Sequence, residues 1–263
     1  MKRILVPVDF SVAAANALRY ALNFSKPFGA EIICLHVTKE TSAHAEALSK
    51  LQKFIAENSL AASSRITVKN VVVNGILGNA VSEFLERKSI DLIVMGTKGA
   101  MGFQKVLSGS NTTDLLSSTS IPILIVPQGF AFSQINIILW ASDFLKLTHS
   151  KALNPLVETA LTYNAEVRIA HVKASDKHGS LSKHFETSHE HHYLEHKGVK
   201  HSLKKISGTD IVGGINYYLQ KKGDNDILVM VRRKHGFLSR IFRRDHTYEF
   251  ACNPTLPLLI LPE

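Results

Sequence analysis

One internal repeat constrains the fold of this chain more than any other feature of the sequence. Four segments recur in the same order at an offset of 134 or 135 residues: 4–10 with 138–144, 30–37 with 165–172, 91–95 with 226–230, and 122–127 with 257–262. Ordered matches at one spacing indicate a duplicated unit rather than chance similarity. We therefore expect two copies of one domain, at residues 1–128 and 134–263.

Within each copy, short apolar runs alternate with helical patterns. Residues 4–8 form a continuous apolar run, which is typical of a strand that is buried on both faces. Ser11 is a candidate N-cap for a helix over residues 13–24. The alternation continues to a fifth strand at residues 123–126. This order predicts an α/β fold with two tandem doubly wound domains, each a mainly parallel five-stranded sheet with helices on both faces.

Composition limits the classes of partner and location. The 31 Lys and Arg residues exceed the 22 Asp and Glu residues by nine, which favours anionic partners in general. Cys34 and Cys252 lie far apart and do not imply a disulfide framework. The apolar run after Met1 ends at Pro7, too early for a signal peptide, and we find no run of the roughly 18 apolar residues that a membrane span needs. We expect a cytoplasmic protein without a transmembrane segment.

A glycine-rich segment follows the fourth predicted strand of the first copy. Its pattern is G-x2-G-x9-G-S, beginning at Gly96 and ending at Ser110. Glycine lets the backbone approach a ligand closely and point its amides inward, and the start of the next helix adds further donors. Because ligands of doubly wound sheets bind at the carboxyl ends of the strands, this segment is a candidate phosphate cradle, with a loop of turn glycines as the alternative.

These segments together resemble the universal stress protein family, in a tandem form with two domains. The residues that carry the resemblance are 4–11, 35–37, 91–96, the glycine-rich segment and 122–127. The resemblance is strong over residues 1–128 and weaker over 134–263. It implies an adenine nucleotide, ATP together with Mg²⁺, bound at the switch point of the first sheet.

Carried over residue by residue, the resemblance assigns a binding role to eleven positions. Asp9 would approach the ribose or a bound Mg²⁺, and the main chain of Val37 would meet the adenine edge. The remaining positions would flank Asp9 or surround the phosphates: Pro7, Val8, Met95, Gly96, Lys98, Gly99, Gly109, Ser110 and Asn111. Asp9 has an alternative role as a turn or capping residue before the helix. The sequence assigns no catalytic residue and no protein-bound metal.

The second copy departs from the pattern of the glycine-rich segment. Met230 is followed by Val231, Arg232, Arg233 and Lys234, so the first two motif glycines are missing. Arg243 and Arg244 stand about where Gly109 and Ser110 stand in the first copy. Side chains at these places obstruct the approach of a phosphate to the backbone. We expect the second copy to be degenerate as a nucleotide site and to serve as a structural or regulatory partner.

Two clusters in the second copy call for separate interpretation. Six Lys and Arg residues between 232 and 244 are interleaved with apolar residues, which suits a polyanion or membrane surface but equally an interface loop. No nucleic-acid motif accompanies them, so nucleic acid is not an expected partner. His189, His192 and His196 would share one face of a helix, with spacing that suits Zn²⁺ or Ni²⁺, although a merely His-rich polar helix is the simpler interpretation.

The sequence leaves three functions open. The first is a nucleotide-binding stress-response protein, at most a slow ATPase. The second is a nucleotide hydrolase or nucleotidyl transferase at the same switch point, and the third is a non-binding interaction protein that acts through its second domain. The resemblance also implies that the two copies pair through their fifth strands, at residues 123–126 and 258–260, and that a homodimer can form.

Overall fold

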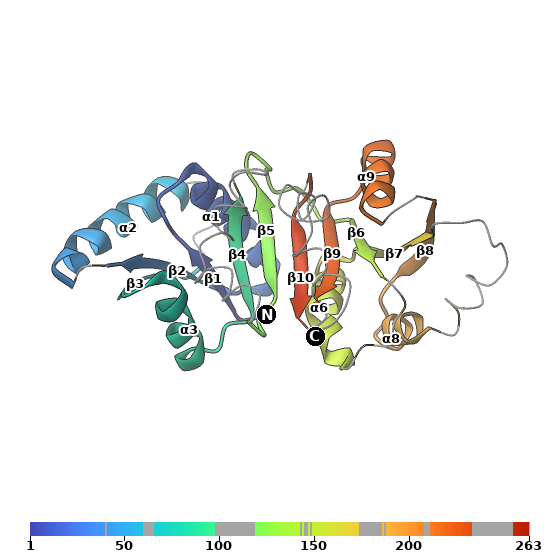
Figure 1. Cartoon of the computed structure of the whole chain (residues 1–263), viewed down its shortest axis with the longest axis horizontal. Helices are drawn as coiled ribbons and strands as arrows, with labels where there is room; N and C mark the ends of the chain where they lie inside the picture. The colour runs from blue at the N-terminus through green and yellow to red at the C-terminus, as the bar shows by residue number, and fades with distance from the viewer. Residues whose placement is uncertain are drawn as a thin grey trace. The chain divides into compact units, whose positions relative to one another are not determined.

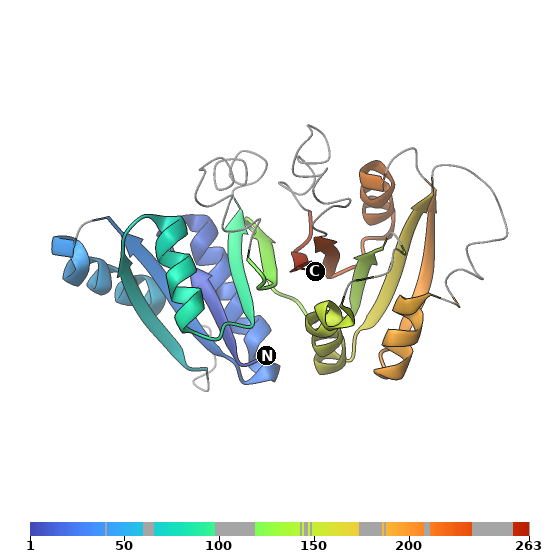
Figure 2. The ribbon, with the colours of Figure 1, turned by 60° about the horizontal axis from the view of Figure 1, so that its bottom comes forward.

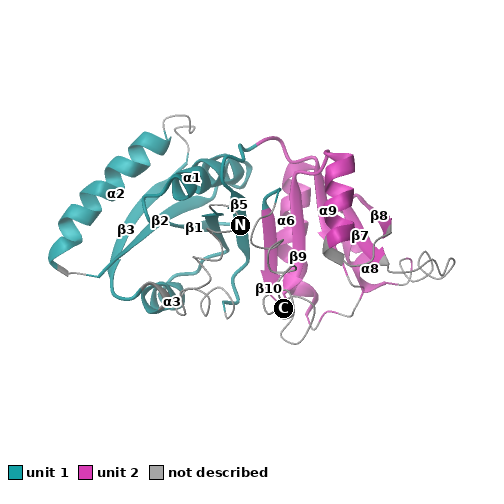
Figure 3. Ribbon diagram, turned by 45° about the horizontal axis from the view of Figure 1, so that its top comes forward, with its two compact units in different colours: residues 1–132, 251–257 teal, residues 133–250, 258–263 magenta. Residues whose placement is uncertain are grey.

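A computed structural model gives the structure of the chain (Figure 1). It describes residues 1–39, 41–59, 66–97, 119–142, 144, 147, 149–173, 186, 188–207, 211–232 and 255–262. Two compact units are present (Figure 3). Unit 1 comprises residues 1–132 and 251–257, and unit 2 comprises residues 133–250 and 258–263.

Unit 1 alternates strands and helices from its first residues. Its elements are β1 (Arg3–Pro7), α1 (Val12–Ser25), η1 (Lys26–Phe28), β2 (Glu31–Thr38), η2 (Thr41–Ala43), α2 (His44–Ser59), β3 (Val68–Asn74), α3 (Leu77–Arg87), β4 (Leu92–Thr97) and β5 (Ile123–Pro127). The strands are ordered β3-β2-β1-β4-β5, and the neighbours pair in parallel. This is the order of a doubly wound sheet.

Unit 2 repeats this architecture. Its elements are β6 (Ile137–Ala141), η3 (Ser150–Leu153), α6 (Asn154–Tyr163), β7 (Glu166–Lys173), α8 (His189–His196), β8 (His201–Ser207), α9 (Ile211–Lys222), β9 (Ile227–Arg232) and β10 (Leu258–Pro262). The order β10-β9-β6-β7-β8 corresponds strand for strand to that of unit 1, and the pairs are again parallel. The predicted fold class is therefore confirmed.

Helices cover both faces of each sheet, as right-handed crossovers require when the chain reverses direction across the sheet. In unit 1, α1 and α2 lie on one face and α3 on the other (Figures 1 and 2). In unit 2, α6 and α8 lie on the face opposite α9 (Figures 1 and 2). The central strands are consequently enclosed, and Ile4, Leu5 and Val6 of β1 have no solvent exposure. Among the described residues, none of the helices combines the length and the apolar character of a membrane span.

The repeat extends to individual hydrogen bonds. Asp91 and Asp226 precede the fourth strands of their units, and one carboxylate oxygen of each accepts two backbone N–H bonds from the start of the neighbouring first strand. The donors are Lys2 and Arg3 in unit 1, at 2.6 and 2.8 Å, and Asn136 and Ile137 in unit 2, at 2.7 and 2.9 Å. Each aspartate thus fixes the first strand beside the fourth, the pair of strands that flanks the switch point.

Candidate functional site

The switch point of unit 1 lies between β1 and β4. From β1 the chain proceeds outward to β2 and β3, and then returns across the sheet to β4 on the other side of β1. Ile4 and Leu5 of β1 pair with Leu92 and Ile93 of β4, so both strands point the same way. Their carboxyl ends therefore open at one edge, where doubly wound folds bind ligands.

Asp9 lies at this edge, in the turn between β1 and α1. Its side chain is exposed, and its Oδ1 accepts a hydrogen bond from the backbone N–H of Ser11 at 3.0 Å. The Ser11 hydroxyl in turn accepts from the N–H of Ala14 at 3.2 Å and caps α1. The alternative role of Asp9 as a turn residue is thus real. It leaves the carboxylate at the surface with its orientation already fixed.

Phe10, the residue after Asp9, contacts His36 of β2. Phe10 adopts a left-handed conformation, with φ of 63°, and its ring lies 4.4 Å from the ring of His36 between centroids. Because the Val8 carbonyl can only accept, His36 Nδ1 carries the proton and donates to it at 2.8 Å. His36 is therefore a satisfied, half-buried histidine that ties β2 to the turn after β1.

Unit 2 contains the same arrangement. Phe144 has a φ of 54°, its ring stacks on that of His171 at 4.9 Å, and His171 Nδ1 donates to the carbonyl of Ser142 at 3.1 Å. The same contact between a left-handed phenylalanine and a histidine occurs in both units. We therefore assign it a structural role in holding the turn after the first strand. Sequence reasoning missed Phe10 and Phe144, although their recurrence in both copies was a visible signal.

Gly96 lies near the end of β4, directly against the first turn of α1. A Cβ at this residue would lie 2.1 Å from the carbonyl oxygen of Ala13 and 2.5 Å from its carbonyl carbon. The backbone of α1 thus requires glycine here for packing, whether or not a ligand is bound. The sequence alone suggested that a glycine is needed here so that a phosphate can approach the backbone. In the structure the neighbour that requires glycine is the backbone of Ala13.

The predicted binding residues fall into two groups. Six lie at the carboxyl ends of β1, β2 and β4 or just after them: Pro7, Val8, Asp9, Val37, Met95 and Gly96. Val8 and Met95 are 5% and 9% exposed, so their side chains serve the core and only their main chain is available to a ligand. The other five, Lys98, Gly99, Gly109, Ser110 and Asn111, lie outside the described residues.

The corresponding edge of unit 2 carries different chemistry. Val231 and Arg232 take the register positions of Gly96 and Thr97, since each pair is aligned with the last two residues of its unit's last strand. Burial lowers the pKa of the Arg232 guanidinium. The first helical segment that the structure describes in unit 2 begins at Ser150, nine residues after the end of β6 at Ala141. Asp143 lies outside the described residues.

Comparison with known proteins supports the family suggested by these features. Residues 1–127 match the model of the universal stress protein family. Universal stress proteins MJ0531 and MJ0577 of Methanocaldococcus jannaschii are 28% and 26% identical to this chain; each match covers 48% of this chain, and 81% and 94% of the relative.

A solved universal stress protein from Archaeoglobus fulgidus resembles the whole chain in fold. It has a TM-score of 0.74 and 19% identity, and the match covers 99% of this chain and 98% of that protein. The sequence match over unit 1 and the fold match over both units agree. Residues 1–127 therefore form a domain of the universal stress protein family, and the second unit shares its fold.

Proposed function

We propose that unit 1 binds an adenine nucleotide, ATP together with Mg²⁺, at the carboxyl ends of β1, β2 and β4. The observation that carries this proposal is the switch point itself. It combines an exposed, pre-oriented Asp9 after β1 with the start of a glycine-rich segment at the end of β4. The resemblance of the sequence to ATP-binding members of the family supplies the identity of the ligand.

In this proposal Asp9 provides the charged contact. An exposed carboxylate suits either a ribose hydroxyl, to which it accepts a hydrogen bond, or Mg²⁺, which prefers oxygen ligands. The turn bond from Ser11 engages only Oδ1. Pro7 and Val8 flank the ligand, and the main chain of Val37 meets the edge of the adenine.

The phosphates fall to the glycine-rich segment. Main-chain amides at glycines, together with the helix start that the sequence predicts after them, suit a triphosphate because they donate hydrogen bonds without a side chain in the way. Packing against Ala13 already accounts for Gly96. The phosphate contacts are therefore assigned mainly to Gly99, Gly109 and Ser110, with Lys98 and Asn111 close by.

Unit 2 is proposed not to bind nucleotide in the same manner. A valine and a half-buried arginine take the places of Gly96 and Thr97 at the end of its fourth strand. The valine side chain covers backbone that a glycine leaves open. Unit 2 then acts as a structural or regulatory partner of unit 1.

The test begins with mass spectrometry of small molecules released from purified protein, and continues with calorimetric titration of Mg·ATP. Asp9→Asn is the sharpest variant, because the asparagine Oδ1 still accepts the bond from Ser11 while the charge is lost. We expect its affinity to fall about tenfold or more, the size of a hydrogen bond to a charged group. Gly109→Val should abolish binding.

Asp143→Asn is the matched control, because it makes the same change at the corresponding position of the second copy. We expect it to retain wild-type affinity. If the wild-type protein releases no nucleotide and shows no binding heat with Mg·ATP, the proposal fails. Unchanged affinity in Gly109→Val would remove the phosphate role from the glycine-rich segment.

A further inference from the structure

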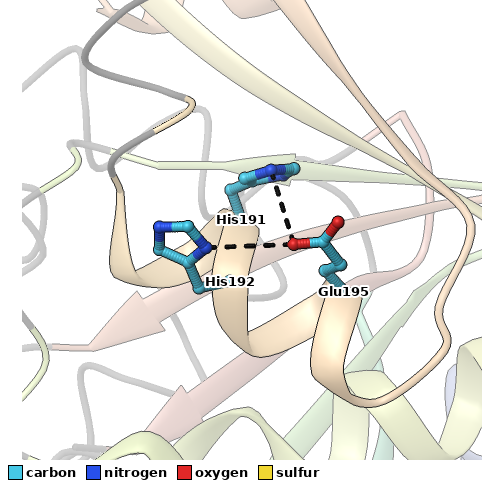
Figure 4. A group of neighbouring side chains, drawn as sticks. All are labelled: His191, His192 and Glu195. Carbon is cyan, nitrogen blue, oxygen red and sulfur yellow. Dashed lines mark ion pairs between the residues drawn. The ribbon is translucent and has the colours of Figure 1, made fainter.

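The His-rich helix α8 of unit 2 brings three metal-binding side chains together. His191 Nε2 and His192 Nδ1 lie 3.8 and 3.9 Å from the same oxygen of Glu195, and all three candidate ligand atoms lie within 4.8 Å of one another (Figure 4). Glu195 is four residues after His191 and three after His192, so both histidines reach it from the preceding turn of the helix.

This group differs from the one that helical spacing alone suggests. His192 belongs to both groups, but the ring of His189 stacks on Tyr193 at 6.0 Å, nearly parallel to it, instead of joining the cluster. The carboxylate of Glu195 and the neighbouring His191 take the places of His189 and His196. The side chains that meet are those of Glu195 and the two histidines one helical turn before it, and not the three histidines that share one face of the helix.

A chain of hydrogen bonds fixes the tautomer of His191. The Val199 carbonyl can only accept, so His201 Nδ1 donates to it at 2.7 Å. In neutral His201 the other nitrogen, Nε2, is then an acceptor, and His191 Nδ1 donates to it at 2.8 Å. The lone pair of neutral His191 therefore lies on Nε2, the nitrogen that faces Glu195.

Such an outer-shell bond is how proteins hold a metal-ligating histidine, since it sets both the tautomer and the orientation of the ring. His191 is held in this way and its side chain is only 22% exposed. The side chains of His192 and Glu195 are 62% and 66% exposed, so they can rotate toward an ion at little cost. Ligands around a tetrahedral zinc lie roughly 3.3 Å apart, for bonds of about 2.0 Å. Small rotations of the His192 and Glu195 side chains would bring the three ligand atoms to that distance from one another.

We propose that α8 carries a zinc-binding site formed by His191 Nε2, His192 Nδ1 and a Glu195 carboxylate oxygen. Two imidazoles and one carboxylate suit a borderline cation such as Zn²⁺, whereas Mg²⁺ and Ca²⁺ prefer oxygen ligands alone. Water completes the coordination at this exposed position. His201 is a positioning residue, which acts through His191. The site lies within unit 2 and is independent of nucleotide binding in unit 1.

The first test is calorimetric titration of the full chain with Zn²⁺, comparing the tightest site among variants. His192→Gln and Glu195→Gln change exposed side chains and are expected to weaken that site about tenfold or more, the cost of altering a metal site. His189→Gln and His196→Gln, on the same helix but outside the cluster, are the matched controls and should keep wild-type affinity. Equal affinity in all five proteins would overturn the proposal.

The second test separates the positioning role of His201 from a structural one. At mildly alkaline pH, nitrogen-15 NMR of the zinc-free protein should find the proton of His191 on Nδ1, and zinc should shift His191 Nε2 and His192 Nδ1. In His201→Phe, His191 should lose its fixed tautomer and zinc affinity should fall about tenfold. A zinc-free His191 with its proton on Nε2, or zinc shifts confined to other histidines, would refute the assignment.

Discussion

Replacement of Gly96 by alanine adds one methyl group where unit 1 has no room for it. The new Cβ would lie 2.1, 2.5 and 3.1 Å from the carbonyl oxygen, carbonyl carbon and Cα of Ala13. These neighbours are backbone atoms in the first turn of α1, and they cannot rotate away as the end of a side chain can. Either α1 or the end of β4 must shift.

The expected cost follows from the severity of this overlap. Inserting an extra methyl group into a packed region typically destabilises a protein by about 1–3 kcal/mol. Because the overlap is with backbone, we expect about 3 kcal/mol at the upper end of that range. For a unit of this size, that corresponds to a fall of roughly 10 °C in Tm.

Hydrogen exchange read by mass spectrometry can localise the effect. In Gly96→Ala, protection should fall in peptides from α1 and β4 and stay at the wild-type level in β6 and β9. The single tryptophan, Trp140, is 1% exposed in β6, so its fluorescence follows unit 2 during urea unfolding. Unchanged protection in α1 and β4, with an unfolding free energy within about 0.5 kcal/mol of wild type, would refute the packing argument.

Three further outcomes follow from individual side chains. Burial raises the pKa of the Cys34 thiol to about 12, so a Cys252→Ser variant should react with a thiol reagent near neutral pH only after unfolding. Asp91→Ala removes the acceptor of the backbone amides of Lys2 and Arg3 at the start of β1 and should cost about 2 kcal/mol in urea unfolding. The hydrogen bond from Ser202 lowers the pKa of Glu166. The ionised Glu166 carboxylate therefore stabilises the fold fully at pH values above its ordinary pKa, and this stabilisation is lost as the pH falls through the lowered pKa. Ser202→Ala should therefore raise this pKa in an NMR titration and weaken the loss of stability in acid.

The sequence was sufficient to predict the fold because the repeat and the apolar runs report the same architecture twice. Residues 4–8 and 138–141 are apolar in both copies, and each run forms the central parallel strand of its unit. Ser11 was predicted as an N-cap and does cap α1. Strand positions and helix caps depend on the local sequence and on the pattern of apolar residues, and both can be recognised in a single sequence.

Details of the site depend instead on contacts between distant segments. The neighbour that requires Gly96 is Ala13, more than eighty residues earlier, and no local pattern identifies it. The same is true of His191 and His201, which meet because α8 packs beside β8. Pairing of the two copies through their fifth strands stays a prediction, as do the roles assigned to the glycine-rich segment.

The central claim is that unit 1, and not its repeat, holds one adenine nucleotide at the carboxyl ends of its strands. The most direct measurement is the stoichiometry of Mg·ATP binding to the intact chain, with hydrogen exchange recorded on the same sample. The account predicts one nucleotide per chain and new protection in peptides that cover residues 5–11 and 92–97. Two nucleotides per chain, or protection that appears instead at residues 137–142 and 227–232, would contradict it.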